Sequence, residues 1–252
     1  MTLSACAEIV RKGDPDRFIA AMAAPREARA RLFPLYAFNL EIARAPWATA
    51  DPLIAKMRLQ FWRDALAEID EGMNPRAHEV VKPLAGVMQW GGLPGKMLDA
   101  MVVARWTDVD REPLRTPEVL DAYLAETAGT LMWASAQALG AQYIREPTVR
   151  AVGKAQGLAS MLVAAPELER RGWFVLPETG VPQMIDAARA DIAEARTIDF
   201  KLSVPALRAA WRADGVLARA AKDPDAIREG RLEGSEIARR AGLAVRSITG
   251  RW

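Results

Sequence analysis

The sequence is poor in the residues that most often carry metal and nucleophilic chemistry. Cys6 is its only cysteine, so a disulfide within the chain and a cysteine-based zinc site are both excluded. His78 is its only histidine, which excludes two-histidine metal motifs and leaves a Ser-His-Asp triad possible only through that residue. No nucleophile motif accompanies His78 near a strand-like segment. We therefore expect neither a zinc enzyme nor a serine hydrolase.

Long hydrophobic runs are also missing. The longest, LASMLVAAP from Leu158, is far too short to span a bilayer, and residues 1–18 contain no apolar stretch of secretory length. These absences predict a soluble, cytoplasmic protein. With 252 residues, 51% of them hydrophobic, and a net charge of +2, the chain has ample material for one core. We predict a single domain over residues 1–252.

The apolar residues that are present recur mostly at intervals of three and four, and no segment alternates like a strand. N-capping residues, prolines and glycines separate these periodic segments. Helices are predicted near 14–24, 26–45, 52–71, 77–90, 94–107, 117–140, 147–171, 182–197, 205–221 and 236–248. Pro34 is expected to kink the second of them, because it lacks an N–H group and its ring crowds the preceding turn. The pattern predicts an all-α fold.

The C-terminal region 201–252 is basic, with eleven Lys or Arg against six acids. Such a surplus could face phosphates or an anionic membrane surface. The competing interpretation, which we favour, is a solvated helix face on which arginines alternate with alanines. Because aromatic residues do not interleave with these charges, nucleic acid is not a predicted partner.

The segment TDVDRE, residues 107–112, places two acids close together near a predicted helix end. Asp108 and Asp110 could bind a cation there. Two acids at this spacing followed by Arg111 are more often part of a solvated loop. We favour the loop.

The segment LYAFNLEIARAPW, residues 35–47, is predicted to be a helix with few polar groups on its inner face. Asn39 and Ala43 share one face while Glu41 points elsewhere, so the helix presents no pair of carboxylates to a metal. In the following helix, Arg63 is expected to pair with a carboxylate such as Glu41. The inner face is therefore expected to pack against helices or to line an apolar pocket.

Taken in order, several segments resemble the squalene and phytoene synthase family of head-to-head prenyl transferases. They are DPDRF (14–18), LYAF (35–38), MRLQFWRDAL (57–66), HEVV (78–81), GLP (92–94), YLAETAGTL (123–131) and GKAQGLASMLVAAPELERRGWFVLP (153–177). One such segment alone would be weak, but the ordered set spans the chain and is specific. The resemblance implies the helical bundle of the isoprenoid synthase fold.

In that family, two facing aspartate-rich helices bind magnesium, which clamps the substrate diphosphate and assists its departure. By the resemblance, the first set of aspartate positions falls on Ala43, Arg44 and Trp47, and the second on Ala164 and Leu168. Without these acids, ionisation of a diphosphate should be slowed by many powers of ten. The resemblance therefore implies no catalytic residue, no metal site and no cofactor.

A family scaffold without its acids is similar to the divergent branch whose mitochondrial members assist assembly of respiratory complex I. This resemblance implies a non-catalytic assembly or interaction factor, located peripherally at the inner face of the membrane. Its partners would be respiratory complex subunits or a membrane surface. The alternative is a prenyl transferase acting on prenyl diphosphates, in which Asp64, Asp108 or Asp110 would coordinate magnesium.

A third hypothesis keeps the family's cavity as a binding site for an isoprenoid lipid without turnover, which needs only apolar walls and a few polar anchors. The candidate anchors are Tyr36, Asn39, Arg63 and Thr127. For Tyr36 and Thr127 we favour core packing or helix capping over ligand binding. A cavity filled by side chains such as Leu162, Met161 and Trp133 would exclude both the enzyme and the lipid carrier.

Overall fold

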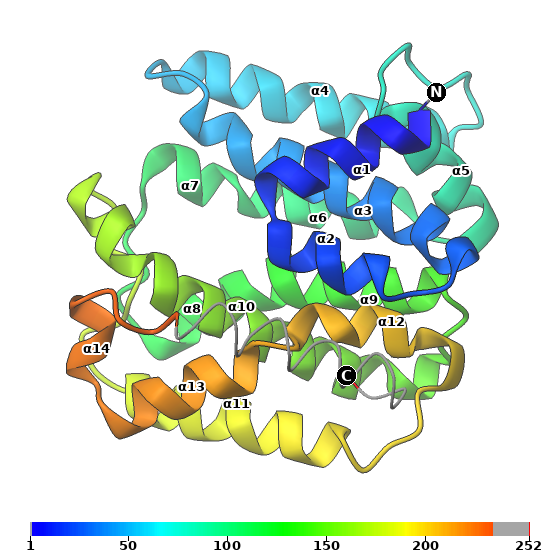
Figure 1. The fold of residues 1–252 in the computed structure, drawn as a ribbon. Helices are drawn as coiled ribbons and strands as arrows, with labels where there is room; N and C mark the ends of the chain where they lie inside the picture. Colours follow the sequence, from blue (N-terminus) through cyan, green and yellow to red (C-terminus); the bar gives the residue numbers. More distant parts are fainter. Residues whose placement is uncertain (1, 234–251) are drawn as a thin grey trace.

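The computed structural model describes residues 2–233 and 252, and within them every regular element is a helix (Figure 1). The α-helices are α1 (Thr2–Gly13), α2 (Pro15–Met22), α3 (Arg26–Arg44), α4 (Pro52–Asp70), α5 (Val81–Gly91), α6 (Gly95–Ala104), α7 (Trp106–Asp110), α8 (Pro117–Leu124), α9 (Thr130–Ala138), α10 (Glu146–Arg170), α11 (Val181–Ala195), α12 (Val204–Leu207), α13 (Ala213–Lys222) and α14 (Asp225–Arg228). Short 3-10 turns occupy η1 (Ala45–Trp47), η3 (Tyr143–Arg145), η4 (Lys201–Ser203) and η5 (Arg208–Ala210). The predicted all-α fold is confirmed.

Two long helices organise the bundle. α3 packs against α1, α5 and α9, while α10 packs against α9, α11 and α13. Every residue of α3 from Leu32 to Leu40 is buried, so this stretch is enclosed by protein around its whole circumference, as expected of a central helix. α3 continues through Pro34, and the kink expected there stays a prediction.

The predicted helix 117–140 contains a π-helical turn, η2 (Ala125–Gly129), between α8 and α9. The backbone N–H of Thr130 bonds to the carbonyl of Ala125, five residues earlier. The Thr130 hydroxyl donates to the same carbonyl over 3.1 Å. Turns of this kind often occur at functional sites.

The π turn and α10 approach each other closely through glycines. A Cβ atom on Gly153 would lie 2.7 Å from the carbonyl oxygen of Ala128, and one on Gly157 would lie 2.6 Å from the Cβ of the same alanine. Neither position has room for a side chain. The two glycines therefore set the spacing between α10 and η2.

Helix ends differ from the sequence-based prediction where distant contacts decide them. The predicted helix 205–221 is broken into α12, η5 and α13, because the chain turns where Arg208 donates to the carbonyl of Ala23 and Trp211 to that of Asp16. α1 was not predicted. The predicted helix 236–248 lies outside the described residues.

Candidate functional site

A cavity of about 300 Å³ opens between α3, the α8–η2 segment and α10. We call it the central cavity. Its lining residues are Asp14, Arg17, Asn39, Ala43, Trp47, Arg105, Asp108, Tyr123, Leu124, Thr127, Ala128, Leu131, Gln156, Gly157, Ser160, Met161, Ala164, Leu168 and Trp173. Met161 therefore borders the cavity and does not fill it.

Two walls of the central cavity carry small or apolar side chains at four positions. Ala43 and Trp47 come from α3 and η1, while Ala164 and Leu168 come from successive turns of α10. Among the lining residues that the structure describes, α3 and α10 contribute no carboxylate. Neither wall therefore offers a charged oxygen ligand for a cation, and the side-chain oxygens of the two walls are those of Asn39, Gln156 and Ser160.

The opposite side of the cavity holds a buried polar cluster. The Tyr123 hydroxyl donates to Asp108 Oδ1 over 2.8 Å, and Arg105 Nη1 lies 3.1 Å from Asp108 Oδ2 and 2.6 Å from the Tyr123 hydroxyl. Burial raises the pKa of the Asp108 carboxyl, and the Arg105 guanidinium opposes that shift. The expectation of a solvated loop was wrong for Asp108, because it lies on the inward face of α7.

A second ion pair reaches the cavity from the start of α2. Asp14 caps this helix by accepting from the backbone N–H of Arg17, and its carboxylate also pairs with Arg17 Nη1 at 2.7 Å. Arg17 Nη2 donates to Gln156 on α10 over 3.1 Å. The Nε atoms of Arg17 and Arg105 are both buried without a hydrogen-bond partner. Each therefore retains a donor within the polar part of the site.

The donor set of the cavity does not fit magnesium. Its carboxylates, Asp14 and Asp108, are each held by an arginine. Across residues 2–233 and 252, no group of three or more His, Cys, Asp or Glu side chains is placed to hold a metal ion. Magnesium needs several oxygen ligands around it, which this arrangement does not assemble.

The predicted anchors divide between the cavity and the core. Asn39 and Thr127 line the cavity, and the Thr127 hydroxyl donates to the carbonyl of Tyr123 over 2.6 Å. Tyr36 is buried in the core with the Arg17 guanidinium 5.2 Å from its ring centre, and burial raises its pKa to about 12. Thr127 thus satisfies a helix carbonyl and Tyr36 packs in the core.

Arg63 lies in a different environment from the one predicted. Its Nε pairs with Asp99 of α6 at 2.7 Å, so the proposed partner Glu41 was wrong. The error arose because α4 packs against α6, a contact that no local pattern reveals. Arg63 is not among the residues lining the central cavity.

The other acids considered for magnesium in the alternative hypothesis also have protein partners. Asp64 accepts from Gln60 over 2.6 Å, and Asp110 pairs with Lys56 at 2.8 Å. Neither lines the central cavity. The three acids named for that hypothesis are therefore not brought together.

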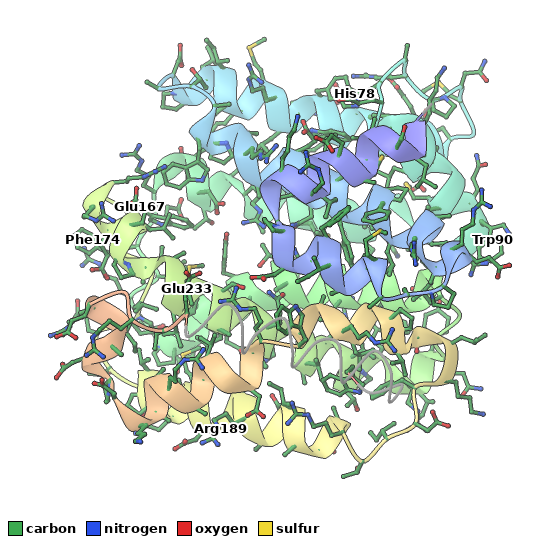
Figure 2. All side chains as sticks on the ribbon, in the orientation of Figure 1. His78, Trp90, Glu167, Phe174, Arg189 and Glu233 are labelled. Carbon is green, nitrogen blue, oxygen red and sulfur yellow. The ribbon has the colours of Figure 1, made fainter. Side chains whose placement is uncertain are left out.

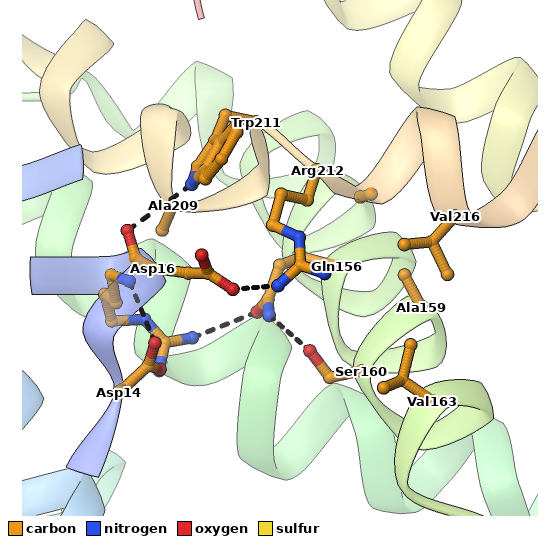
Figure 3. Close-up of a pocket in the computed structure, with 12 residues that line it drawn as sticks. Asp14, Asp16, Gln156, Ala159, Ser160, Val163, Ala209, Trp211, Arg212 and Val216 are labelled. Carbon is orange, nitrogen blue, oxygen red and sulfur yellow. Dashed lines mark hydrogen bonds and ion pairs between the residues drawn. The ribbon is translucent and has the colours of Figure 1, made fainter. Parts of the chain in front are cut away.

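A smaller hollow of about 170 Å³, the side pocket, adjoins the central cavity and shares Asp14, Arg17, Gln156 and Ser160 with it (Figure 3). Figure 3 shows the chain of bonds that crosses it: Arg212 pairs with Asp16, while Gln156 joins Arg17 to Ser160. The polar side chains shared by the two hollows are thus held by contacts within the protein.

Sequence reasoning did not identify Arg17, Arg105 or Tyr123 as site residues. The segments DPDRF and YLAETAGTL contained two of them, so a signal existed for Arg17 and Tyr123. No sequence signal pointed to Arg105, because its partner Asp108 was expected to lie in a solvated loop.

The sequence is similar to one protein family and to several curated proteins. The family model described as squalene/phytoene synthase matches residues 10–247. Over 173 residues the chain is 28% identical to human "NADH dehydrogenase (ubiquinone) complex I, assembly factor 6", covering 68% of this chain and 52% of that protein. It is 29% identical over 170 residues to the Drosophila melanogaster homolog, covering 64% and 50%. The chain thus spans about half the length of the curated relatives it matches.

Two solved structures share the fold. A dehydrosqualene synthase in complex with ligand has a TM-score of 0.82 at 17% identity, covering 99% of this chain and 96% of that one. A squalene synthase from Alicyclobacillus acidocaldarius has a TM-score of 0.62 at 18% identity, with coverages of 99% and 94%. At this identity the likeness establishes the fold alone. It confirms the predicted isoprenoid synthase architecture.

Proposed function

We propose that this chain, which belongs to the squalene/phytoene synthase family, is a non-catalytic factor for the assembly of respiratory complex I. It would work in the cytoplasm and peripherally at the inner face of the membrane, with complex subunits and the membrane surface as its partners. The names of its relatives support the assembly role. No helix within residues 2–233 is long and apolar enough to cross a bilayer.

The observation that carries the proposal is that, among the described residues lining the central cavity, α3, η1 and α10 contribute no carboxylate. By the family resemblance, Ala43, Trp47, Ala164 and Leu168 occupy positions where the enzymes carry magnesium-binding aspartates. All four line one cavity. The fifth such position, Arg44, is not among the lining residues. In this proposal the scaffold and the facing arrangement are retained, while alkyl and aromatic groups stand at the four positions that line the cavity.

The remaining charges of the cavity do not compensate for this loss. Arg17 and Arg105 are each paired with a carboxylate, Asp14 and Asp108 respectively. A diphosphate placed here would meet two ion pairs of no net charge and no divalent cation. Uncompensated charge in a partly desolvated site is costly, so neither binding nor ionisation of a diphosphate is favoured.

A second function is favoured by the cavity itself: binding of an isoprenoid lipid without turnover. A volume of about 300 Å³ falls at the lower end of the range for ligand pockets. Apolar side chains such as Trp47, Leu131 and Leu168 cover part of the lining. Asn39 and Thr127 supply neutral polar groups, and the two ion pairs supply charged ones. Such binding would need no cofactor.

Calorimetric titration with farnesyl and geranylgeranyl diphosphate, with and without magnesium, separates these functions from the prenyl transferase. Product extraction follows from the same tubes. We expect no product in either condition. Magnesium-dependent binding with a coupled hydrocarbon product would overturn the non-catalytic proposal, whereas magnesium-independent binding without product would favour the lipid carrier.

The assembly role is tested by removing the gene from the organism that encodes the chain. We expect NADH:quinone oxidoreductase activity and the intact complex I band on native gels to fall, while succinate dehydrogenase activity in the same membranes is unchanged. A plasmid copy of the chain should restore both. Normal complex I in the deletion strain would contradict the proposal.

In the described part of the basic C-terminal region, the arginines give little support to the proposed location at the membrane. Arg208 and Arg219 donate to backbone carbonyls, while Arg212 pairs with Asp16. Arg231 pairs with Asp223 and Glu229. The remaining basic residues of this region include four in 234–251, outside the described part. The four arginines named first are engaged within the protein, whereas Lys201 of the same region is exposed.

A further inference from the structure

One end of the bundle exposes large apolar side chains from the last turns of α2 and α5 and from the 3-10 turns η3 and η4. We call it the aromatic end and define it by Met22, Trp90, Tyr143, Ile144 and Leu202, whose exposed fractions are 41%, 63%, 68%, 78% and 79%. Figure 2 labels Trp90 at the right of the molecule, and Figure 1 shows the ends of α2 and α5 and the connections 139–145 and 196–203 on the same side. Exposed apolar groups concentrated in this way mark an interaction surface.

Hydrogen bonds hold these elements next to one another. Gln137 Nε2 donates to the carbonyl of Gly92, just beyond Trp90, and to the Tyr143 hydroxyl, each over 3.1 Å. Arg31 lies over the Trp90 ring and donates to the carbonyl of Ala138. η4, which carries Leu202, packs against α9. The exposed side chains therefore belong to one surface.

The same end carries more cations than acids. Its basic residues are Arg26, Arg29, Arg31, Arg145 and Lys201. Its acids, apart from Glu146, which pairs with Arg150, are Glu27 and Asp199. Cations placed around exposed aromatic and aliphatic groups complement the anionic headgroups and the apolar interior of a lipid surface.

Leu202 is presented by an unusual backbone. Lys201 has φ of 49°, in the left-handed region that a lysine rarely adopts, and its N–H bonds to Asp199 Oδ1 over 2.9 Å. The flanking residues Phe200 and Ser203 are buried. Because both neighbours are anchored, the turn holds Leu202 outward. A strained turn that exposes a leucine is a costly arrangement for a residue with no role at the surface.

We propose that the aromatic end is the surface by which this protein docks on an anionic lipid membrane, an inference that rests on the membrane address of the proposed function. Met22, Trp90, Tyr143, Ile144 and Leu202 would enter the headgroup region while the surrounding arginines and Lys201 contact lipid phosphates. A lipid surface fits better than a protein groove, because these side chains stand on the ends of two helices and on two short turns and need no matching partner shape.

The test uses the whole chain and vesicles of phosphatidylcholine with roughly 30% phosphatidylglycerol, an anionic content to which polybasic surfaces respond. Sedimentation measures binding, and brominated lipids report insertion by quenching tryptophan fluorescence. All eight tryptophans lie in the described part of the chain, and Trp90 is the one that is exposed. We expect binding that weakens with salt, together with quenching that is lost in Trp90→Ala.

A double variant, Ile144→Ser with Leu202→Ser, should reduce vesicle binding roughly tenfold or more. Its matched control is Leu53→Ser with Met57→Ser on α4, where the exposed fractions are 66% and 63% but the residues lie outside the aromatic end. The control should bind like the parent. All substituted residues are exposed, so each variant is expected to fold, and circular dichroism checks this.

Three results would overturn the inference. They are absence of vesicle binding by the parent chain, equal binding by the Ile144/Leu202 variant, or equal loss in the α4 control. If the Ile144/Leu202 variant binds vesicles normally yet fails to restore complex I in the deletion strain, the aromatic end contacts a protein and the lipid assignment is wrong. Because vesicle binding needs no other protein, it can fail while the assembly role stands.

Discussion

The hydroxyl of Tyr123 donates to the carboxylate of Asp108 over 2.8 Å, deep in the wall of the central cavity. Arg105 contacts both groups, and its side chain is only 13% exposed. Three polar side chains from α7, α8 and the residue that joins α6 to α7 thus satisfy one another where water has little access. The cluster therefore joins these elements to one another and fixes the side chains that line this part of the cavity.

Asp108→Ala should destabilise the protein by about 3–5 kcal/mol, because it leaves the Arg105 guanidinium buried without its counter-charge. Urea denaturation followed by circular dichroism measures the change. The control is Asp110→Ala two residues away, whose pair with Lys56 is exposed and should contribute less than about 1 kcal/mol. Equal losses in the two variants would show that burial of the Asp108 pair has no special effect.

Gly153→Ala should destabilise the protein by about 1–3 kcal/mol, although alanine favours helix formation. The new methyl group would lie 2.7 Å from both the Ala128 carbonyl oxygen and the Met132 Cβ, and backbone cannot move aside cheaply. Gly86 in α5 is the matched control, since a methyl group there would meet nothing within 4 Å and Gly86→Ala should stabilise the helix slightly. Thermal unfolding of both variants decides the matter, and a stable Gly153→Ala variant would refute the close approach.

Cys6 should be nearly inert in the folded protein. Burial raises the pKa of its thiol to about 12, so at pH 8 roughly one thiol in ten thousand is the reactive thiolate. Ellman's reagent should therefore react slowly with native protein and quickly after addition of guanidinium. Since Cys6 is the only cysteine, the signal has one source. Rapid reaction of the native protein would contradict its burial.

The same pKa predicts an alkaline effect on stability. As the pH rises above about 8.5, the unfolded thiol ionises while the folded thiol, with its pKa near 12, stays protonated. The thiolate therefore favours the unfolded state, and stability is lost progressively between these two values. Cys6→Ala should show a smaller loss over the same pH range when unfolding free energies are compared at each pH.

Introducing carboxylates on the two apolar walls should create a response to magnesium that the parent chain lacks. In Ala43→Asp with Ala164→Asp, both new acids face the central cavity, and oxygen ligands of this kind suit the cation. We expect millimolar magnesium to raise the melting temperature of the double variant and to leave the parent unchanged. Calcium and sodium serve as controls for ion type and ionic strength. A comparable shift in the parent would indicate magnesium ligands that the cavity does not display.

Periodic patterns within one segment were enough to predict the central helices. The helix 147–171 was expected almost as α10 has it, because its apolar spacing and its closing Arg-Gly are local features. Even α1 carried a usable signal, since Leu3, Cys6 and Val10 are spaced three and four apart and the last two are buried. Local chemistry thus decides most helix positions in this chain.

The candidate site was less predictable, because its contacts join residues far apart in the sequence. Arg63 could be expected to find a carboxylate, but whether Glu41 or Asp99 lay opposite depended on how α4 packs. Asp108 was taken for a solvated residue because only the fold brings Tyr123 to it. Asn39 and Thr127 line the cavity, and their role as anchors for a ligand stays a prediction.

The π turn at η2 has a consequence for how this protein can tolerate change in chain length. Because its hydrogen bonds span five residues where an α-helix spans four, the turn accommodates one extra residue between α8 and α9. Removing one residue from 125–129 should therefore restore regular α-helical hydrogen bonds while α8 and α9 keep their present faces. A residue removed from within α8 or α9 would instead turn the part of the helix beyond it by about 100° and separate Tyr123 or Trp133 from its present neighbours. The π turn is thus the place in this helix where chain length can change with least effect on the packing on either side.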